Sequence, residues 1–195
     1  MPVALSDRAA DNLKFIRETI AHAGAFTSVS GAGMITTGVL GLGAAVIAPP
    51  VNLASDPQKF LAVWVVTALL GGLSSWVMIR RKANGAGQSL LDGPARRFGL
   101  AFAPAFAAGA VLTVALVAGG QAALLPGTWL TLYGAAVTAG GALSVKPVPI
   151  MGAAFIALGA LCFAVPAQYQ QYILAAGFGG LHLAFGIQIT RHYGG

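Results

Sequence analysis

The sequence predicts an all-α polytopic membrane protein: six transmembrane helices in three antiparallel hairpins, preceded by an amphipathic helix. Hydrophobic residues make up 57% of the 195 residues and charged residues only 8%, against about 25% charged in soluble domains. Six apolar stretches approach the ~20 residues that a spanning helix needs. Basic residues gather in alternate connections. Together these observations exclude a soluble globular enzyme, a disordered chain and a disulfide-stapled scaffold.

The predicted spans follow continuously apolar runs. They are Val29–Ala48, Phe60–Ile79, Phe98–Val117, Thr128–Val145, Val148–Val165 and Tyr172–Thr190. Each must be helical, because lipid offers the backbone no hydrogen-bond partner. Short proline-containing outer turns predict the three hairpins; these turns are Pro49-Pro50, Pro126-Gly127 and Pro166-Ala167.

The basic residues orient the chain. Of the 11 Lys and Arg residues, only Lys59 falls on the outer side of this topology. The positive-inside rule therefore predicts a multi-pass protein of the bacterial inner membrane with both termini cytoplasmic. The second loop carries the predicted topology and lipid anchors Arg80, Arg81, Lys82, Arg96 and Arg97. We expect membrane lipids as partners. Nucleic acid is not expected, because the loop has no aromatic side chain to stack on a base.

Residues 1–28 are predicted to form a cytoplasmic amphipathic segment ahead of the transmembrane domain, residues 29–195. Its helix covers residues 5–24, where apolar residues recur at spacings of three and four: Leu5, Ala9, Leu13, Ile16, Ile20 and Ala23. A helix lying on the membrane surface is the first interpretation. A docking helix for a cytoplasmic partner is the alternative.

His182 is the first candidate for a functional side chain. Among Asp, Glu, Lys, Arg and His residues it alone lies well inside a predicted span, where ionisable groups are costly. Gly179 and Gly186 share its helix face, so the imidazole is expected to face a neighbouring helix. It could make a hydrogen bond across that contact, line a proton or solute path, or ligate haem with a second subunit. Pro104 is a candidate kink in the third span.

Nothing in the sequence indicates catalysis. It contains no nucleophile with its base, no paired carboxylates, no metal-ligand spacing and no phosphate loop, and the single cysteine, Cys162, is interpreted as a packing residue. We therefore expect neither an enzyme nor a resident cofactor or metal. Small residues spaced by four predict close helix packing and either a homo-oligomer or a subunit of a larger complex; examples are Thr37/Gly41, Gly71/Ser75, Gly134/Thr138 and Ala176/Gly180/Ala184.

Three functions remain open from the sequence. The first is a non-enzymatic accessory or structural protein that acts through helix packing and contacts with lipid or a protein partner. The second is a small-solute or ion channel or transporter, with Pro104, His182 and polar Thr and Ser positions lining its path. The third is a redox subunit that holds haem or quinone through His182.

Two stretches and the histidine segment resemble a known group of proteins. They are Asp11–Thr19 leading into Phe26–Val29, then Gly141–Pro149, then Gly177–Gly186. Together they resemble a family of uncharacterised bacterial six-span integral membrane proteins. In architecture alone, the three-hairpin layout is similar to the bacterial acid-resistance six-span membrane family. The resemblance implies the six-span fold and no particular activity.

Overall fold

The computed structural model describes residues 12–13, 15–16, 26–48, 57–87, 89–90 and 93–193. From Gly31 to Tyr193 the described chain is a series of mostly long, apolar helices. These are α2 (Gly31–Ile47), α3 (Pro57–Gly85), α4 (Gly93–Ala118), η1 (Ala122–Leu124) running into α5 (Leu125–Gly141), α6 (Pro147–Ala164), and a final helix made of α7 (Ala167–Leu174), η2 (Ala175–Leu181) and α8 (His182–Tyr193).

The helices confirm an all-α chain of the multi-pass membrane type. Within the described ranges, five helices are long and apolar enough to cross a membrane. The remaining one, α2, is apolar but has only 17 residues, so the sixth span stays a prediction. Of the predicted amphipathic helix, only residues 12–13 and 15–16 are described, and they are helical; its other residues lie outside the described part of the chain.

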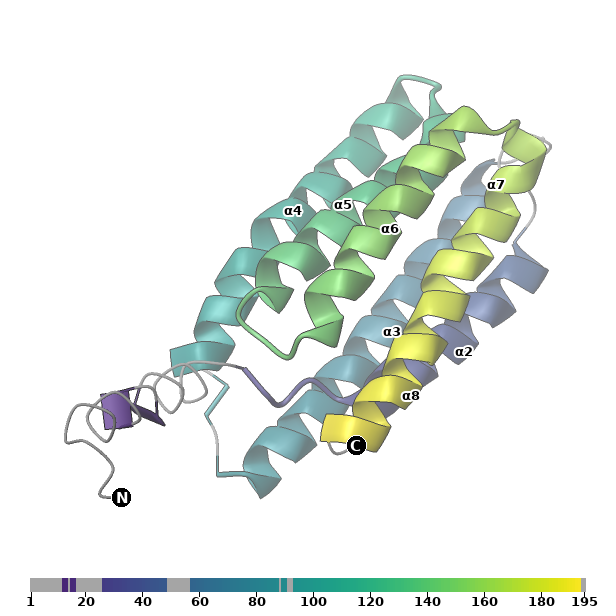
Figure 1. The fold of residues 1–195 in the computed structure, drawn as a ribbon. Coiled ribbons are helices and arrows are strands. Elements are labelled where there is room, and N and C mark those ends of the chain that lie inside the picture. The colour runs from purple at the N-terminus through teal and green to yellow at the C-terminus, as the bar shows by residue number, and fades with distance from the viewer. Residues whose placement is uncertain are drawn as a thin grey trace, which may run out of the picture.

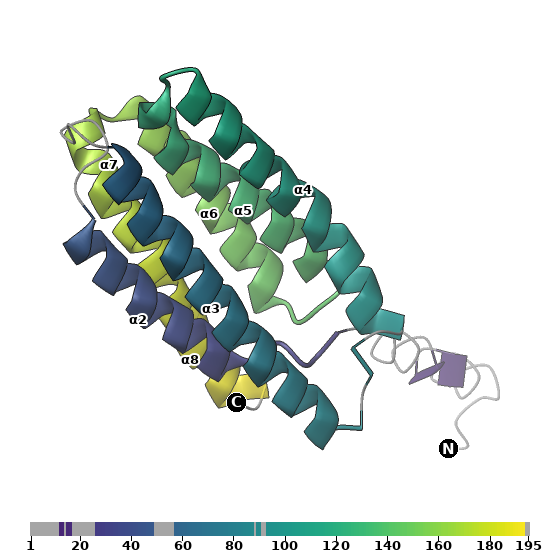
Figure 2. The same cartoon turned by 180° about the vertical axis from the view of Figure 1, so that it is seen from behind.

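The helices form two groups of three (Figures 1 and 2). In the first group, α2 packs between α3 and the final helix. In the second, α5 packs between α4 and α6. We call these the α2 group and the α5 group, after their central helices.

The two helices of the third predicted hairpin touch each other, but each packs mainly on another partner. These helices, α6 and α7–α8, are joined by a short connection, but α6 packs mainly on α5 and α8 packs mainly on α2. Glycine explains this choice of partner. A Cβ at Gly152 of α6 would lie 2.8 Å from the carbonyl oxygen of Gly134 of α5, and one at Gly186 of α8 would lie 3.0 Å from that of Gly31 of α2. Backbones this close leave no room for side chains, as in other membrane helix pairs rich in small residues.

The pair α2–α3 adds a polar contact to the α2 group. Thr37 Oγ1 lies 3.1 Å from Ser75 Oγ and donates to the carbonyl oxygen of Gly71 at 3.3 Å. A Cβ at Gly71 would lie 3.1 Å from Thr37 Cγ2. The predicted small-residue row Gly71/Ser75 is therefore confirmed as a helix contact.

One predicted turn lies elsewhere. Pro126 and Gly127 belong to the first turn of α5, and the preceding connection is residues 119–124. Proline fits the first turn of a helix because the backbone N–H that it lacks would have no intrahelical partner there. A Cβ at Gly127 would lie 2.6 Å from the ring of Phe163, so α5 and α6 approach each other closely here. The predicted span Thr128–Val145 thus begins at Leu125 and ends at Gly141.

Residues 26–30 connect the two groups at one end of the molecule. We call them the N-terminal strap and the end where they lie the strap end; the opposite end is the distal end. The strap's Phe26 donates its N–H to the carbonyl of Leu143 at 2.7 Å and accepts from Ser144 Oγ at 2.6 Å. Lys82 Nζ donates to the carbonyls of Val29 and Tyr193, at 3.1 and 3.0 Å. The strap therefore joins α3, the α5–α6 turn and the chain's end.

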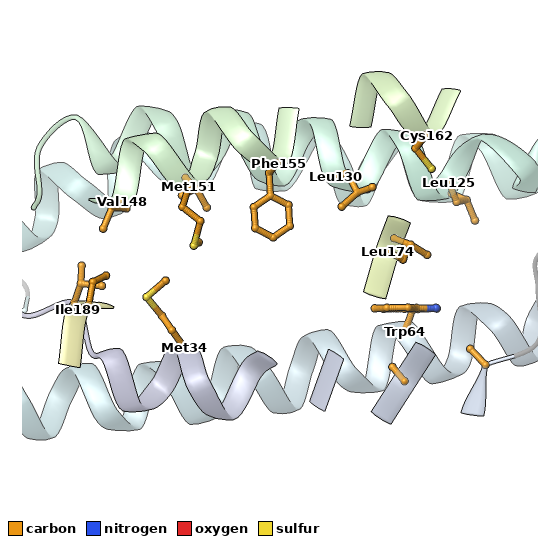
Figure 3. Close-up of a cluster of buried hydrophobic side chains, with 14 of the residues drawn as sticks. Met34, Trp64, Leu125, Leu130, Val148, Met151, Phe155, Cys162, Leu174 and Ile189 are labelled. Atoms are coloured by element: carbon orange, nitrogen blue, oxygen red, sulfur yellow. The ribbon is translucent and has the colours of Figure 1, made fainter. Parts of the chain in front are cut away.

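The core lies between the two groups (Figure 3). Toward the strap end its buried apolar side chains include Met34, Val148, Met151 and Ile189. We call these four residues the apolar plug. Toward the distal end lie Leu125, Cys162 and Leu174 with Trp64. Phe155 lies between these two sets and leads to the site.

Candidate functional site between the two helix groups

A histidine–tyrosine pair joins the two groups about halfway along the helices. His182 of α8 is 2% exposed, and its Nε2 lies 2.7 Å from the hydroxyl of Tyr133 of α5. Because a neutral imidazole has one donor and one acceptor nitrogen, the direction of this hydrogen bond depends on the tautomer. The predicted hydrogen bond from His182 across a helix contact is present, and Tyr133 is its partner.

Aromatic rings surround this pair. Phe155 lies edge-on to both, with ring centroids 4.9 Å from Tyr133 and 5.3 Å from His182. Phe178 stacks on His182 at 6.2 Å and lies 5.3 Å from Tyr133. Phe102 of α4 meets Tyr133 at 6.2 Å. The pair is thus surrounded by side chains from three helical segments, α4, α6 and η2, which belong to both groups.

The backbone before His182 widens into a π-helical turn. Residues Ala175–Leu181 carry it, and three of these seven residues are glycines. Such wide turns are rare and occur often at functional sites. Backbone groups of Gly177 and Phe178 lie beside the imidazole, but none reaches Nδ1 with hydrogen-bond geometry. Tyr133 therefore makes the hydrogen bond that holds the ring.

The π turn also points its glycines in different directions. A Cβ at Gly177 would lie 2.5 Å from Leu130 Cδ2 of α5, and one at Gly179 would lie 2.7 Å from Leu42 Cγ of α2. The turn thus packs closely on both groups. This places the segment just before His182 at the junction between them.

Three further buried side chains lie toward the distal end, and we call them the distal polar cluster: Trp64, Gln170 and Gln171. Gln170 Nε2 donates to the carbonyl of Cys162 at 3.3 Å, and Gln171 Nε2 donates to those of Ala45 and Ala48 at 2.8 and 3.2 Å. These bonds satisfy carbonyls at the ends of α6 and α2, which lack intrahelical partners. Trp64 Nε1 and both glutamine Oε1 atoms have no partner among the described residues.

An aromatic row connects the distal polar cluster to the central pair. Trp64 lies 5.8 Å from Phe178, centroid to centroid, and 6.4 Å from Phe60. Phe60 stacks on Trp129 of α5 at 5.6 Å, and Trp129 Nε1 donates to Thr113 Oγ1 of α4 at 2.8 Å. The rings therefore run from α5 across to α3 and on through Phe178 to His182.

The predicted site residues separate into two places. Gly179 and Gly186 flank His182 but pack against Leu42 and Ile35 of α2, whereas the imidazole faces Tyr133. Pro104 is exposed within the uninterrupted helix α4 and does not join the buried pair. The threonines and serines singled out for a path lie mostly inside the groups, as in the contact of Thr37 with Ser75.

The predicted basic anchors lie at the strap-end termini of α3 and α4. Arg80, Arg81, Arg96 and Arg97 are exposed, and Arg80 lies over the ring of Trp76 at 5.2 Å. Lys82 differs from the other four because it bonds Val29 and Tyr193. It therefore has a structural role that the sequence pattern does not reveal.

Sequence reasoning missed Tyr133 and the distal polar cluster. Tyr133 carried a usable signal, since a tyrosine in the middle of a span must find a buried partner for its hydroxyl. Gln170 and Gln171 lie just before the predicted sixth span, where polar residues are typical of a loop. Only the structure shows that they are buried.

Comparisons with protein families, curated proteins and solved structures find no match. The site therefore rests on its own geometry, and the resemblance to the six-span families stays a prediction. What the fold and site define is a class: a multi-pass helical membrane protein with a buried polar centre between two helix groups.

Proposed function

We propose that the protein is a non-enzymatic carrier or channel for a small solute in the bacterial inner membrane, with its path between the α2 group and the α5 group. The observation that carries this proposal is the position of the His182–Tyr133 pair. It is a buried polar contact between groups rather than within one. Intramembrane ionisable residues that face a bundle's interior typically mark solute or proton paths.

The packing of the groups supports the same function. Within each group, helices meet backbone to backbone at glycines such as Gly38, Gly134 and Gly152. Between groups, at the site, aromatic side chains and one hydrogen bond make the contact. Rigid bodies that meet through side chains can move relative to one another at lower cost than helices locked by backbone contact. Alternating access of this kind is common in transporters.

The orientation belongs to the same proposal. The exposed arginines lie at the strap end, so the positive-inside rule assigns that end, with both termini, to the cytoplasm. A cysteine scan in the Cys162→Ala background tests this. In intact cells, Asn84→Cys should resist a membrane-impermeant maleimide, and Gln121→Cys should react with it. The opposite labelling pattern would show that the protein has the reverse orientation in the membrane.

Flux measurements test the proposed function. The purified protein is reconstituted into liposomes and assayed with a panel of small neutral and charged solutes. We expect flux of at least one solute class, reduced at least tenfold in His182→Gln. The matched control is His192→Gln, since His192 is exposed near the chain's end. Absence of flux for every solute, or equal flux in both variants, would refute the proposal.

An accessory role is the second candidate, favoured by α4. None of its 26 residues is buried, although it is strongly apolar. A face of this kind suits lipid, a second copy of the chain or a subunit of a larger complex. Native mass spectrometry after gentle extraction tests this: added protein mass supports the accessory role, and a bare monomer argues against it.

A haem ligand is not supported by the arrangement of His182. Its Nε2 is held by Tyr133, and its Nδ1 faces the backbone of the π turn. Neither nitrogen is directed to an open position. The ring would have to leave both neighbours before it could ligate a metal.

A further inference from the structure

The N-terminal strap is buried although it is not helical. Its residues Phe26, Ser28, Val29 and Ser30 are 4%, 2%, 7% and 4% exposed, and residues 27–30 belong to no helix or strand. Segments of this kind usually run over the surface, where water satisfies their backbone groups. A buried segment instead needs partners from the rest of the chain, and these partners show what the strap holds together.

The start of the strap is bound to the α5 group. The N–H of Phe26 donates to the carbonyl of Leu143 at 2.7 Å, and the carbonyl of Phe26 accepts from Ser144 Oγ at 2.6 Å. Both partners lie in the connection between α5 and α6. The ring of Phe26 packs against that of Phe98 of α4, with the centroids 5.0 Å apart. One strap residue therefore contacts both α4 and the α5–α6 connection.

The end of the strap is bound to the α2 group. The carbonyl of Val29 accepts from Lys82 Nζ of α3 at 3.1 Å, and the same Nζ donates to the carbonyl of Tyr193 at the end of α8. Ser30 Oγ accepts from the N–H of Gly33 at 3.2 Å and so caps the first turn of α2. Together these contacts tie the end of the strap to α2 and α3, and through Lys82 to α8.

The strap is short enough to limit how far the two groups can separate. Phe26 and Val29 are three residue steps apart, and a chain spans at most about 3.6 Å per residue. The two bound residues can therefore lie no more than about 11 Å from each other. While both stay bound, the groups cannot move far apart at the strap end.

The strap end is also where apolar side chains fill the interface. The apolar plug takes two residues from each group (Figure 3): Met34 and Ile189 from the α2 group, Val148 and Met151 from the α5 group. Val148 comes four positions after Ser144, so the connection that binds the strap leads directly into the plug. A solute on the proposed path would have to part the plug. Parting it requires the two groups to separate where the strap joins them.

We infer that the N-terminal strap is an autoinhibitory latch: its contacts with both groups keep the strap end of the path closed, and release of Phe26 from the α5 group lets that end open. The inference rests on the proposed function and specifies how its path is gated. Two hydrogen bonds and a ring contact bind Phe26 to the α5 group. These local contacts can break and re-form as the groups move, whereas the glycine contacts inside each group join whole helices.

Access to the plug tests the latch without any solute. Met151→Cys in the Cys162→Ala background is the reporter, and its alkylation by N-ethylmaleimide is followed in nanodiscs. Met151 is 2% exposed, so the reporter should react slowly. Adding Phe26→Ala should raise the alkylation rate at least fivefold. The matched control Phe106→Ala removes an exposed ring of α4 and should leave the rate unchanged.

A milder variant covers the case in which Phe26→Ala does not fold, as judged by circular dichroism. Ser144→Ala removes only the hydroxyl that donates to the strap, and should raise the alkylation rate in the same direction. Its matched control is Ser74→Ala, because the hydroxyl of Ser74 donates to a carbonyl of its own helix.

A reversible lock tests the latch in solute flux. Phe26 and Ser144 are paired as a β-bridge, and residues paired in this way lie about 5 Å apart, within the range of a disulfide. Phe26→Cys/Ser144→Cys in the Cys162→Ala background is reconstituted into liposomes and assayed with glycerol, urea, choline and lactate. We expect oxidation to abolish the flux and reduction to restore it. The matched control Thr37→Cys/Ser75→Cys places a disulfide inside the α2 group, where the two Oγ atoms lie 3.1 Å apart, and should not change the flux.

The outcomes separate the latch from the proposed function. Flux that persists unchanged in the oxidised strap variant overturns the latch and leaves the proposed function standing. So does an equal loss of flux in the control disulfide, or an alkylation rate that neither strap variant raises. No flux of any probe in the parent protein or in the reduced strap variant refutes the proposed function, and the latch with it.

Discussion

Replacing Gly134 by alanine tests whether the α5–α6 contact is a backbone-to-backbone seam. A Cβ at this position would lie 2.7 Å from the carbonyl oxygen of Gly152 and 2.7 Å from the N of Ile156. Ordinary van der Waals contact begins at 3.4 Å, so the helices must separate by roughly 3.4 − 2.7 = 0.7 Å at this point. Because backbone atoms line both sides, no side-chain rotation can relieve the overlap.

The matched control is Gly72→Ala. Gly72 lies inside α3, and a Cβ there meets nothing within 4 Å. Both changes exchange glycine for alanine inside a helix, so the intrinsic helix preference, about 1 kcal/mol, cancels in the difference between them. What remains is the cost of overpacking, which is about 1–3 kcal/mol.

Unfolding in mixed micelles provides the assay. Sodium dodecyl sulfate is titrated against each variant, and loss of structure is followed by tryptophan fluorescence and circular dichroism. We expect Gly134→Ala to be less stable than Gly72→Ala by about 1–3 kcal/mol. A difference below about 0.5 kcal/mol, the range of surface substitutions, would show that α5 and α6 do not meet through their backbones.

Three more predictions concern side chains that make hydrogen bonds between helices or to helix ends. Tyr133→Phe should lower the free energy of unfolding by about 0.6–1.7 kcal/mol in the same titration, the range for hydrogen bonds between membrane helices. The control Tyr172→Phe changes an exposed ring and should have no effect. Equal losses of stability in the two variants would exclude a stabilising role for the His182–Tyr133 hydrogen bond. Lys82→Met removes the hydrogen bonds to Val29 and Tyr193, so amide hydrogen exchange in the last turn of α8 should accelerate at least tenfold. The control Arg81→Met should leave this exchange rate unchanged. An unchanged rate in Lys82→Met would show that the two hydrogen bonds do not stabilise this turn. Gln171→Leu removes the amide that donates to the carbonyls of Ala45 and Ala48, and should speed amide hydrogen exchange in the distal turn of α2. The control is Gln188→Leu, at an exposed position. Equal exchange rates in the two variants would contradict a capping role for Gln171.

The sequence predicted the helices well because hydropathy acts locally. Five predicted spans correspond to helices of sufficient length and apolarity. Their ends were less predictable. Gln170 and Gln171 lower the local hydropathy, yet the final helix begins before them at Ala167, because their side chains are buried against other helix ends.

The sequence predicted one member of the central pair, His182, but not its partner, Tyr133. His182 stands out because histidine is rare inside a span, but its partner is 49 positions away, and no local pattern indicates which helices will meet. The rows of small residues predicted that helices pack closely, but not which helices pair. In the structure, Gly134 packs against α6 and Gly186 packs against α2. The π turn was hidden because its glycine-rich segment also fits an α-helix.

The pairing of α2 with α8 has a consequence for biosynthesis. The glycines Gly31, Gly38 and Gly41 of α2 pack against the final helix, which is synthesised after all the other described helices. Until translation ends, the groove formed by Gly31, Gly38 and Gly41 has no partner helix from its own chain. The nascent chain thus presents a short helix with an open face to the insertion machinery for almost the whole of its synthesis. Completion of this contact is in this way tied to the arrival of the final helix, so a product truncated before it would leave the glycine-bearing face of α2 uncovered, with α3 as its remaining partner.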